Sequence, residues 1–183
     1  MVVTTRTYAQ VALADPDGFW ELHDGVLRGK PAMAYGHNFA MRVLSHDLMV
    51  QLGRATYQVS VNASRVRQTE ANYSIPDLAV IPVASMARYR EQRRELEVYD
   101  EPLPLVVEIW SPSTGDYDIE TKLPTYQQRG DREIWRVHPF DRTVTVWRRQ
   151  DDGTDDEAVY RGGTIELFAL PGITIDLDAL FEG

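Results

Sequence analysis

The chain of 183 residues contains no cysteine, which excludes disulfide bonds, thiolate metal sites and a cysteine nucleophile. It also lacks a run of about eighteen apolar residues, so we expect no membrane span. No basic segment followed by an apolar one opens the chain, so no secretory signal is visible and a cytoplasmic location is expected. No repeat or long linker divides the sequence, and we predict one domain over residues 1–183.

Motifs of several common enzyme classes are also missing. The sequence has no GxGxxG or GxxxxGK nucleotide-binding loop and no GxSxG serine-hydrolase motif. Its four histidines form no HxH or HxxxH pair, and His37 and His46 lie nine residues apart. The histidines alone therefore predict no metal site, and nucleotide-binding and serine-hydrolase functions lose their usual support.

Negative charge dominates the sequence, with a net charge of −9 that disfavours contact with nucleic acid. Residues 150–183 account for −8 of this charge, which leaves residues 1–149 close to neutral at −1. Between positions 54 and 94, three acidic residues are outnumbered by seven arginines: Arg54, Arg65, Arg67, Arg88, Arg90, Arg93 and Arg94. This excess predicts either a basic face for phosphate or, as charge alone favours, an ordinary solvated surface.

Hydrophobic patterns predict a mixed sheet packed by helices, an α/β fold. We expect helices over residues 7–13, 37–52, 86–97 and 117–129, with Gly130 closing the last and Pro124 interrupting it. Strands are expected at residues 57–61, 78–81, 103–110, 133–138 and 143–148. Turn residues predict one hairpin at 19–27 around Asp24-Gly25 and another at 159–168 around Gly162-Gly163.

Two carboxylates lie in otherwise apolar strand segments. Glu108 interrupts LPLVVEIW, which is typical of a strand buried on both faces, and an unpaired carboxylate there would cost several kcal/mol. Asp77 follows Pro76 and precedes the apolar run LAVI. Each has an ordinary alternative, a solvated strand end for Glu108 and a plain turn for Asp77. Together, on neighbouring strands, they would suit one hard divalent cation and its bound water.

Lys122 is the third candidate. It lies four residues after Asp118 on the predicted helix that follows the Glu108 strand, and it is one of only two lysines beside seventeen arginines. The ordinary interpretation is a surface ion pair worth a few tenths of a kcal/mol. The functional interpretation is an ammonium that reaches back over the strand end to position water or stabilise phosphate charge.

The quoted residues occur in a wider pattern. YSIPDLAVIP, then PLPLVVEIWSPSTGDYDIETKLPTYQQRGDREIWRVHP, and upstream FWELHDGVLRG before His37, resemble the Uma-type family of restriction-endonuclease-like bacterial proteins over residues 7–170. That family belongs to the PD-(D/E)XK nuclease superfamily. The superfamily lysine normally lies two residues after the second acid, where this chain has Trp110. The resemblance therefore selects Lys122 as the displaced lysine. Pro124 and His138 are further departures from the family pattern.

The resemblance implies a restriction-endonuclease-like mixed sheet flanked by helices, with an N-terminal helix and hairpin and C-terminal hairpins. It implies catalysis by Asp77, Glu108 and Lys122, and Mg²⁺ or Mn²⁺ held by Asp77, Glu108 and the Ile109 carbonyl. Glu21 and His37 would be accessory residues near the site.

The function expected from this resemblance is metal-dependent cleavage of DNA. A homodimer is expected because cutting both strands of a duplex needs two sites. The alternative is a non-catalytic interaction module that keeps the fold as a scaffold.

Overall fold

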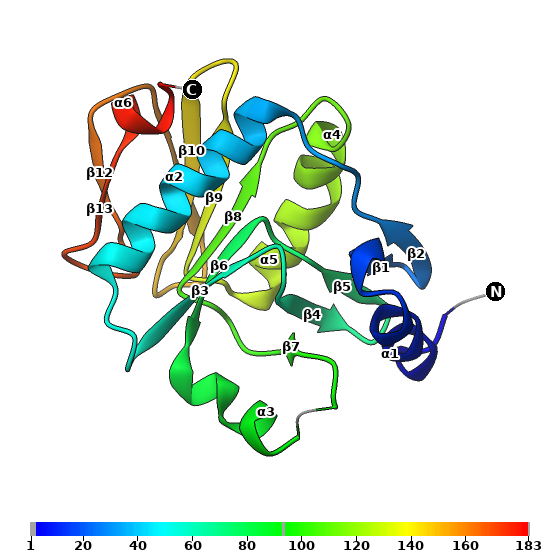
Figure 1. Ribbon diagram of the computed structural model, residues 1–183. Coiled ribbons are helices and arrows are strands. Elements are labelled where there is room, and N and C mark those ends of the chain that lie inside the picture. Colours follow the sequence, from blue (N-terminus) through cyan, green and yellow to red (C-terminus); the bar gives the residue numbers. More distant parts are fainter. Residues whose placement is uncertain (1–2, 93, 183) are drawn as a thin grey trace.

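A six-stranded mixed sheet forms the centre of the computed structural model, which describes residues 3–92 and 94–182 (Figure 1). Only the β8–β9 pair is parallel within this sheet. The strands follow the order β11 (Asp155–Tyr160), β10 (Thr143–Arg149), β9 (Glu133–His138), β8 (Leu105–Ile109), β6 (Leu78–Pro82) and β3 (Tyr57–Val61).

Both faces of the central strands are buried, as the continuous apolar run around Glu108 predicts. Alternate residues of β6 and β8 enter two different hydrophobic clusters: Leu78 and Val107 belong to one, and Ala79 and Val106 to the other. The long helix α2 (Tyr35–Gln51) lies across the first face, and α5 (Leu123–Arg129) packs on the second (Figure 1). Glu108, next to Val107, therefore faces α5.

A second sheet carries the N-terminal part of the site. Its order is β2 (Val26–Gly29), β1 (Trp20–His23), β5 (Asn72–Ser74), β4 (Arg65–Thr69) and β7 (Val98–Tyr99). The predicted hairpin at residues 19–27 is confirmed, because β1 and β2 pair across Asp24 and Gly25, both with positive φ. Helix α1 (Thr5–Ala14) packs beside β1, and a 3₁₀ turn, η1 (Pro16–Gly18), joins them. The sequence did not predict β4, β5 or β7.

The expected hairpin at residues 159–168 is wrong. Strand β11 pairs instead with β10, while β12 (Thr164–Glu166) pairs with β13 (Thr174–Asp176). The Gly162-Gly163 segment is a connection between two sheets, and its turn residues do not determine which strands pair. The short helix α6 (Leu177–Leu180) follows, its N-terminus capped by the Asp176 side chain.

The segment from 86 to 97 is only partly helical. A 3₁₀ turn, η2 (Val83–Met86), leads into the short helix α3 (Ala87–Glu91), and no helix continues to 97. Two of the seven arginines between positions 54 and 94, Arg67 and Arg88, pair with Asp100, so part of the local positive charge is compensated. Arg93 lies outside the described residues.

The predicted helix at 117–129 is divided into three parts. Helix α4 (Gly115–Tyr117) passes into a π-helical turn, η3 (Asp118–Lys122), and then into α5. Leu123 N–H donates to the Asp118 carbonyl five residues back, and Pro124 has no N–H to donate to Glu120. The widened turn carries Asp118 and Lys122, both buried, and Gly130 closes α5 with a positive φ, as predicted.

Candidate active site

A buried polar cluster lies at one end of the paired strands β6 and β8. Leu78 pairs with Val107 and Ala79 with Val106, so the next pair in this antiparallel register is Asp77 opposite Glu108. The Ile109 N–H donates to Asp77 Oδ2 over 2.7 Å, which ties the two strand ends together. The register therefore brings the two predicted acids side by side.

Both oxygens of Asp77 have cationic or polar donors. Lys30 Nζ donates to Oδ1 at 2.6 Å, and His37 Nε2 lies 3.0 Å from Oδ2. Burial opposes ionisation of Asp77, but Lys30 and then His37 outweigh it and hold the pKa of this carboxyl well below its usual range. Asp77 is therefore a buried carboxylate anion with its negative charge already compensated.

Glu108 receives its hydrogen bonds from the helical segment that follows its own strand. Tyr126 OH donates to Glu108 Oε1 at 2.5 Å, and Lys122 Nζ donates to the same oxygen at 3.2 Å. Burial raises the pKa of Glu108 to about 8, even though Lys122 opposes this rise, and the nearby Asp118 and Asp77 add to it. Without a further cation, ionising this carboxyl group is unfavourable.

Lys122 joins three carboxylates from three parts of the chain. Its Nζ lies 3.1 Å from Glu21 Oε1, 3.2 Å from Glu108 Oε1 and 3.4 Å from Asp118 Oδ1. Burial lowers the pKa of Lys122, but Glu108 and then Glu21 outweigh it and raise it well above the usual value. Lys122 is 2% exposed, so the alternative of a simple surface pair with Asp118 is wrong.

The accessory residues named from the sequence also lie here. Glu21 on β1 accepts the Ile75 N–H at 2.7 Å as well as contacting Lys122, and it thereby links the second sheet to the first. His37, in the first turn of α2, is 1% exposed; its Nε2 lies 3.0 Å from Asp77 Oδ2, and its Nδ1 has no hydrogen-bond partner among the described residues. The five residues whose side chains were predicted from the sequence to form the site therefore all lie in one buried cluster: Glu21, His37, Asp77, Glu108 and Lys122.

Four further residues belong to the cluster and were not assigned as site residues from the sequence. Lys30 comes from the connection between β2 and α2, where no periodic pattern marks it. Asp118 and Tyr126 lie on the predicted helix, and their spacing to Lys122 was the available signal. Arg136 pairs in register with Glu108 across β8 and β9, and its buried Nε has no hydrogen-bond partner within residues 3–92 and 94–182.

Comparison with known proteins identifies the family of the chain. The sequence model of the Uma2 family, described as "Putative restriction endonuclease", matches residues 6–178. The chain belongs to the Uma2 family. The match includes every residue of the cluster.

The structure of the chain is similar to the crystal structure of a "putative nuclease belonging to DUF820" from Anabaena variabilis ATCC 29413. That similarity has a TM-score of 0.69 at 16% identity, over 88% of this chain and 89% of the other. It shows that the two proteins share a fold. No curated protein matches the chain.

The donor chemistry of the cluster fits a hard divalent cation. Four buried carboxyl groups (Glu21, Asp77, Glu108 and Asp118) meet three cationic side chains (Lys30, Lys122 and Arg136), so the fully ionised cluster carries −1 with His37 neutral. Asp118 Oδ1 is buried and accepts no hydrogen bond from the described part of the chain, although Lys122 Nζ lies 3.4 Å away. Among residues 3–92 and 94–182, however, no three carboxylate or histidine groups already surround one point as metal ligands. The ammonium groups of Lys30 and Lys122 lie among the carboxyl oxygens of the cluster, where a bound cation would lie.

Proposed function

We propose that this protein is a nuclease that hydrolyses DNA phosphodiester bonds with the help of Mg²⁺ or Mn²⁺. The observation that carries the proposal is the buried cluster, in which four carboxyl groups outnumber three cationic side chains and one Asp118 oxygen accepts no hydrogen bond from the described residues. A cluster of this kind costs stability unless it binds something positive. The family description and the nuclease description of the Anabaena protein support the same activity.

Asp77 and Glu108 would hold the metal ion, with the Ile109 carbonyl as a further oxygen ligand. When bound, the ion supplies a water of lowered pKa and neutralises phosphate charge. Lys122 would place a fixed ammonium beside the phosphate, where negative charge grows in the transition state. Glu21 would hold Lys122 in position, since it contacts this ammonium at 3.1 Å. His37 would orient Asp77 through its 3.0 Å contact.

Two arginines near the cluster offer contacts for the phosphates of DNA. Arg28 is exposed and pairs in register with Glu21, and its guanidinium lies 4.9 Å from the centre of the Tyr117 ring. Arg136 adjoins Glu108 across the strands. Guanidinium groups bind phosphate oxygens through paired N–H donors. A homodimer would supply the two sites that cleavage of both DNA strands requires.

The test is plasmid nicking with Mn²⁺ by the wild type and by Asp77→Asn, Lys122→Ala and Lys122→Arg. Each variant should lose about a hundredfold or more in rate, because a metal ligand or a preorganised ammonium is removed or misplaced. Matched controls are Asp116→Asn and Glu120→Gln, since both side chains are exposed on the same helical segment. These controls should stay within about twofold of the wild type. Circular dichroism confirms folding of each variant.

The competing function is a non-catalytic scaffold, favoured by the occupation of both Asp77 oxygens by donors of the protein itself. A folded wild type that cleaves no nucleic acid with any divalent metal supports the scaffold. Equal cleavage by the wild type and Lys122→Ala would instead show that Lys122 has no catalytic role. A Mn²⁺-induced shift of the thermal midpoint, lost in Asp77→Asn, distinguishes a metal site from a scaffold without measuring cleavage.

A further inference from the structure

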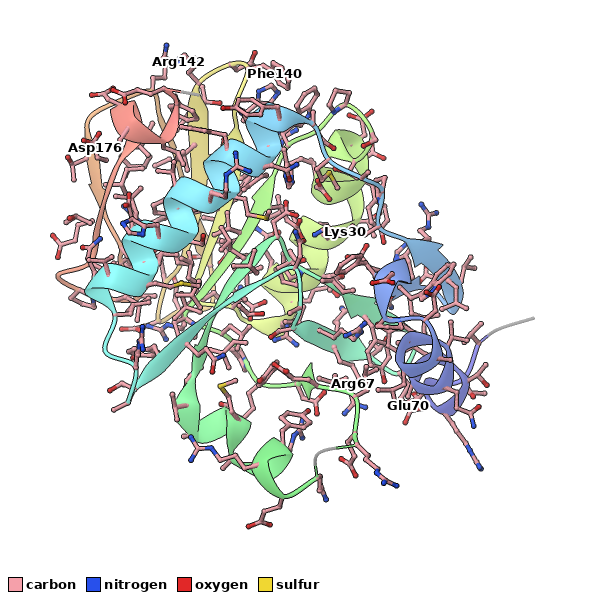
Figure 2. All side chains as sticks on the ribbon, in the orientation of Figure 1. Lys30, Arg67, Glu70, Phe140, Arg142 and Asp176 are labelled. Atoms are coloured by element: carbon pink, nitrogen blue, oxygen red, sulfur yellow. The ribbon has the colours of Figure 1, made fainter. Side chains whose placement is uncertain are left out.

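Lys30 lies in a cradle of three oxygens beside Asp77. Its Nζ donates to Asn62 Oδ1 at 2.5 Å, to Asp77 Oδ1 at 2.6 Å and to the Ile75 carbonyl at 2.9 Å. These three acceptors use all three N–H donors of the ammonium. The side chain of Lys30 is 6% exposed, and Figure 2 shows it inside the molecule, between the N-terminal hairpin and the central sheet.

The three oxygens are also the donor types that a hard divalent cation takes. A carboxylate, an amide carbonyl and a backbone carbonyl are common ligands of such ions. The ammonium and a metal ion bound to Asp77 therefore compete for the same carboxylate oxygen, Oδ1. Because Asp77 Oδ2 already accepts from Ile109 N–H and contacts His37, it offers no unoccupied alternative.

The Lys30 side chain lies beside an irregular segment and a surface cavity into which its ammonium group could move. Lys30 follows the end of β2, and residues 30–34 form neither helix nor strand before α2 begins. A surface cavity of about 290 Å³ is lined by Lys30 together with Asn62, Asn38 and Phe19. On the Glu108 side, by contrast, the cavity beside Asp118 and Arg136 holds only about 10 Å³. Access for an ion, and an exit for the ammonium, therefore lie on the Lys30 side.

We propose that Lys30 is an internal competitor for the divalent cation, so that the metal binds Asp77 only after the Lys30 ammonium leaves its three-oxygen cradle. This inference rests on the proposed function, because it concerns the metal of that same site. Lys30 is then the residue that determines how tightly the protein binds its metal. Lys122, on the opposite side of the carboxylates, stays in place.

The first experiment measures Mn²⁺ binding by calorimetry and by loss of the free-Mn²⁺ electron paramagnetic resonance signal. Lys30→Met should bind Mn²⁺ at least about tenfold more tightly than the wild type, because the competing charge is gone. Adding Asp77→Asn to this variant should abolish the gain. The matched control is Arg54→Met, which removes one exposed positive charge without touching the cluster and should bind as the wild type does.

Lys30→Met leaves Asp77, Asn62 and the Ile75 carbonyl without their donor, so it is expected to unfold at a lower temperature in EDTA. Mn²⁺ should restore its thermal midpoint and raise it by more than in the wild type. Lys30→Gln, which keeps an N–H donor but no charge, serves if Lys30→Met does not fold. It should show the same increase in Mn²⁺ affinity.

The second experiment needs no variant. The chain has only two lysines, so acetylation followed by mass spectrometry reports Lys30 and Lys122 separately. Both are shielded in this structure. Saturating Mn²⁺ should increase acetylation of Lys30 severalfold and leave Lys122 protected.

The outcomes separate the two proposals. Equal Mn²⁺ affinity in the wild type and Lys30→Met, or a Lys30 that stays protected while Mn²⁺ is bound, overturns the competitor role and leaves the nuclease proposal standing. Failure of both folded proteins to bind Mn²⁺ at millimolar concentration overturns both proposals. Tighter binding by Lys30→Met with Lys30 exposed by Mn²⁺ in the wild type supports both.

Discussion

Two buried ionic groups of this protein differ in how completely their members are paired. The Arg129–Asp131 pair connects α5 to the loop before β9, with Nε 3.1 Å from Oδ2. Arg129 also donates to the backbone carbonyls of Arg67, Tyr99 and Glu101, and the Leu103 N–H donates to Asp131 at 2.7 Å. One positive charge meets one negative charge, and their surrounding hydrogen bonds are satisfied.

The cluster around Asp77 and Glu108 is different. It combines four carboxyl groups with two ammonium groups and the Arg136 guanidinium, and among the described residues Asp118 Oδ1 and Arg136 Nε have no hydrogen-bond partner. Burial raises the pKa of Asp118 and Glu108, as it does the pKa of Asp131, so the two groups differ in charge balance and in hydrogen bonding. A balanced pair stabilises a fold, whereas an unbalanced buried cluster is typical of a site that binds another charged group.

The largest effect that tests this difference is expected from Arg129→Met. It leaves the Asp131 carboxyl buried without its partner, and removing one member of such a pair costs about 3–5 kcal/mol of unfolding free energy. Urea denaturation at neutral pH measures the loss. Under conditions where the variant is folded, Mn²⁺ binding should match the wild type. A loss below about 1 kcal/mol would show that the Arg129–Asp131 pair does not support the fold.

An effect of opposite sign is expected from Glu108→Gln in EDTA. The neutral amide removes one negative charge from the unbalanced cluster, and this change should raise the unfolding free energy by about 1–2 kcal/mol at pH 8. The sign depends on pH. Because the folded pKa of Glu108 is raised from 4.5 to about 8, the contribution of its protonated carboxyl group to wild-type stability is fully present below pH 4.5 and is lost as pH rises toward 8. The gain in Glu108→Gln should therefore shrink at low pH.

Urea titrations of Glu108→Gln between pH 5 and 8 measure this effect. The exposed Asp116→Asn serves as the control and should change stability by less than about 0.5 kcal/mol across the range. Destabilisation by Glu108→Gln at pH 8 would mean that the cluster is balanced in the metal-free protein, as the Arg129–Asp131 pair is. Mn²⁺ binding should be weakened in Glu108→Gln even though its fold is more stable.

Much of the site could be predicted because its residues break local patterns. Glu108 is a carboxylate in an apolar strand, and Lys122 is one of two lysines in an arginine-rich chain. Lys30 breaks no pattern, since it lies in an irregular segment. Its partners Asn62, Ile75 and Asp77 are 32 to 47 residues away in sequence. Only the folded structure shows that this lysine adjoins Asp77.

The fold predictions likewise succeeded where a local sequence pattern was present and failed where the structure depends on distant residues. Long periodic segments such as α2 and the apolar strand β8 were predicted because one face, or both, must be buried. The short polar strands β4 and β5 carry little hydrophobic signal and depend on their neighbours in the second sheet. The hairpin expected around Gly162-Gly163 failed because a turn sequence does not specify which strand becomes the partner.

The most direct test of the account is a crystal structure of the protein soaked with Mn²⁺, recorded at the manganese absorption edge. The account predicts an anomalous peak with carboxyl oxygens of Asp77 and Glu108 at roughly 2.0–2.6 Å, and Lys30 Nζ outside its three-oxygen cradle. No anomalous peak near these carboxylates at saturating Mn²⁺, with Lys30 still bound to Asp77, would contradict it.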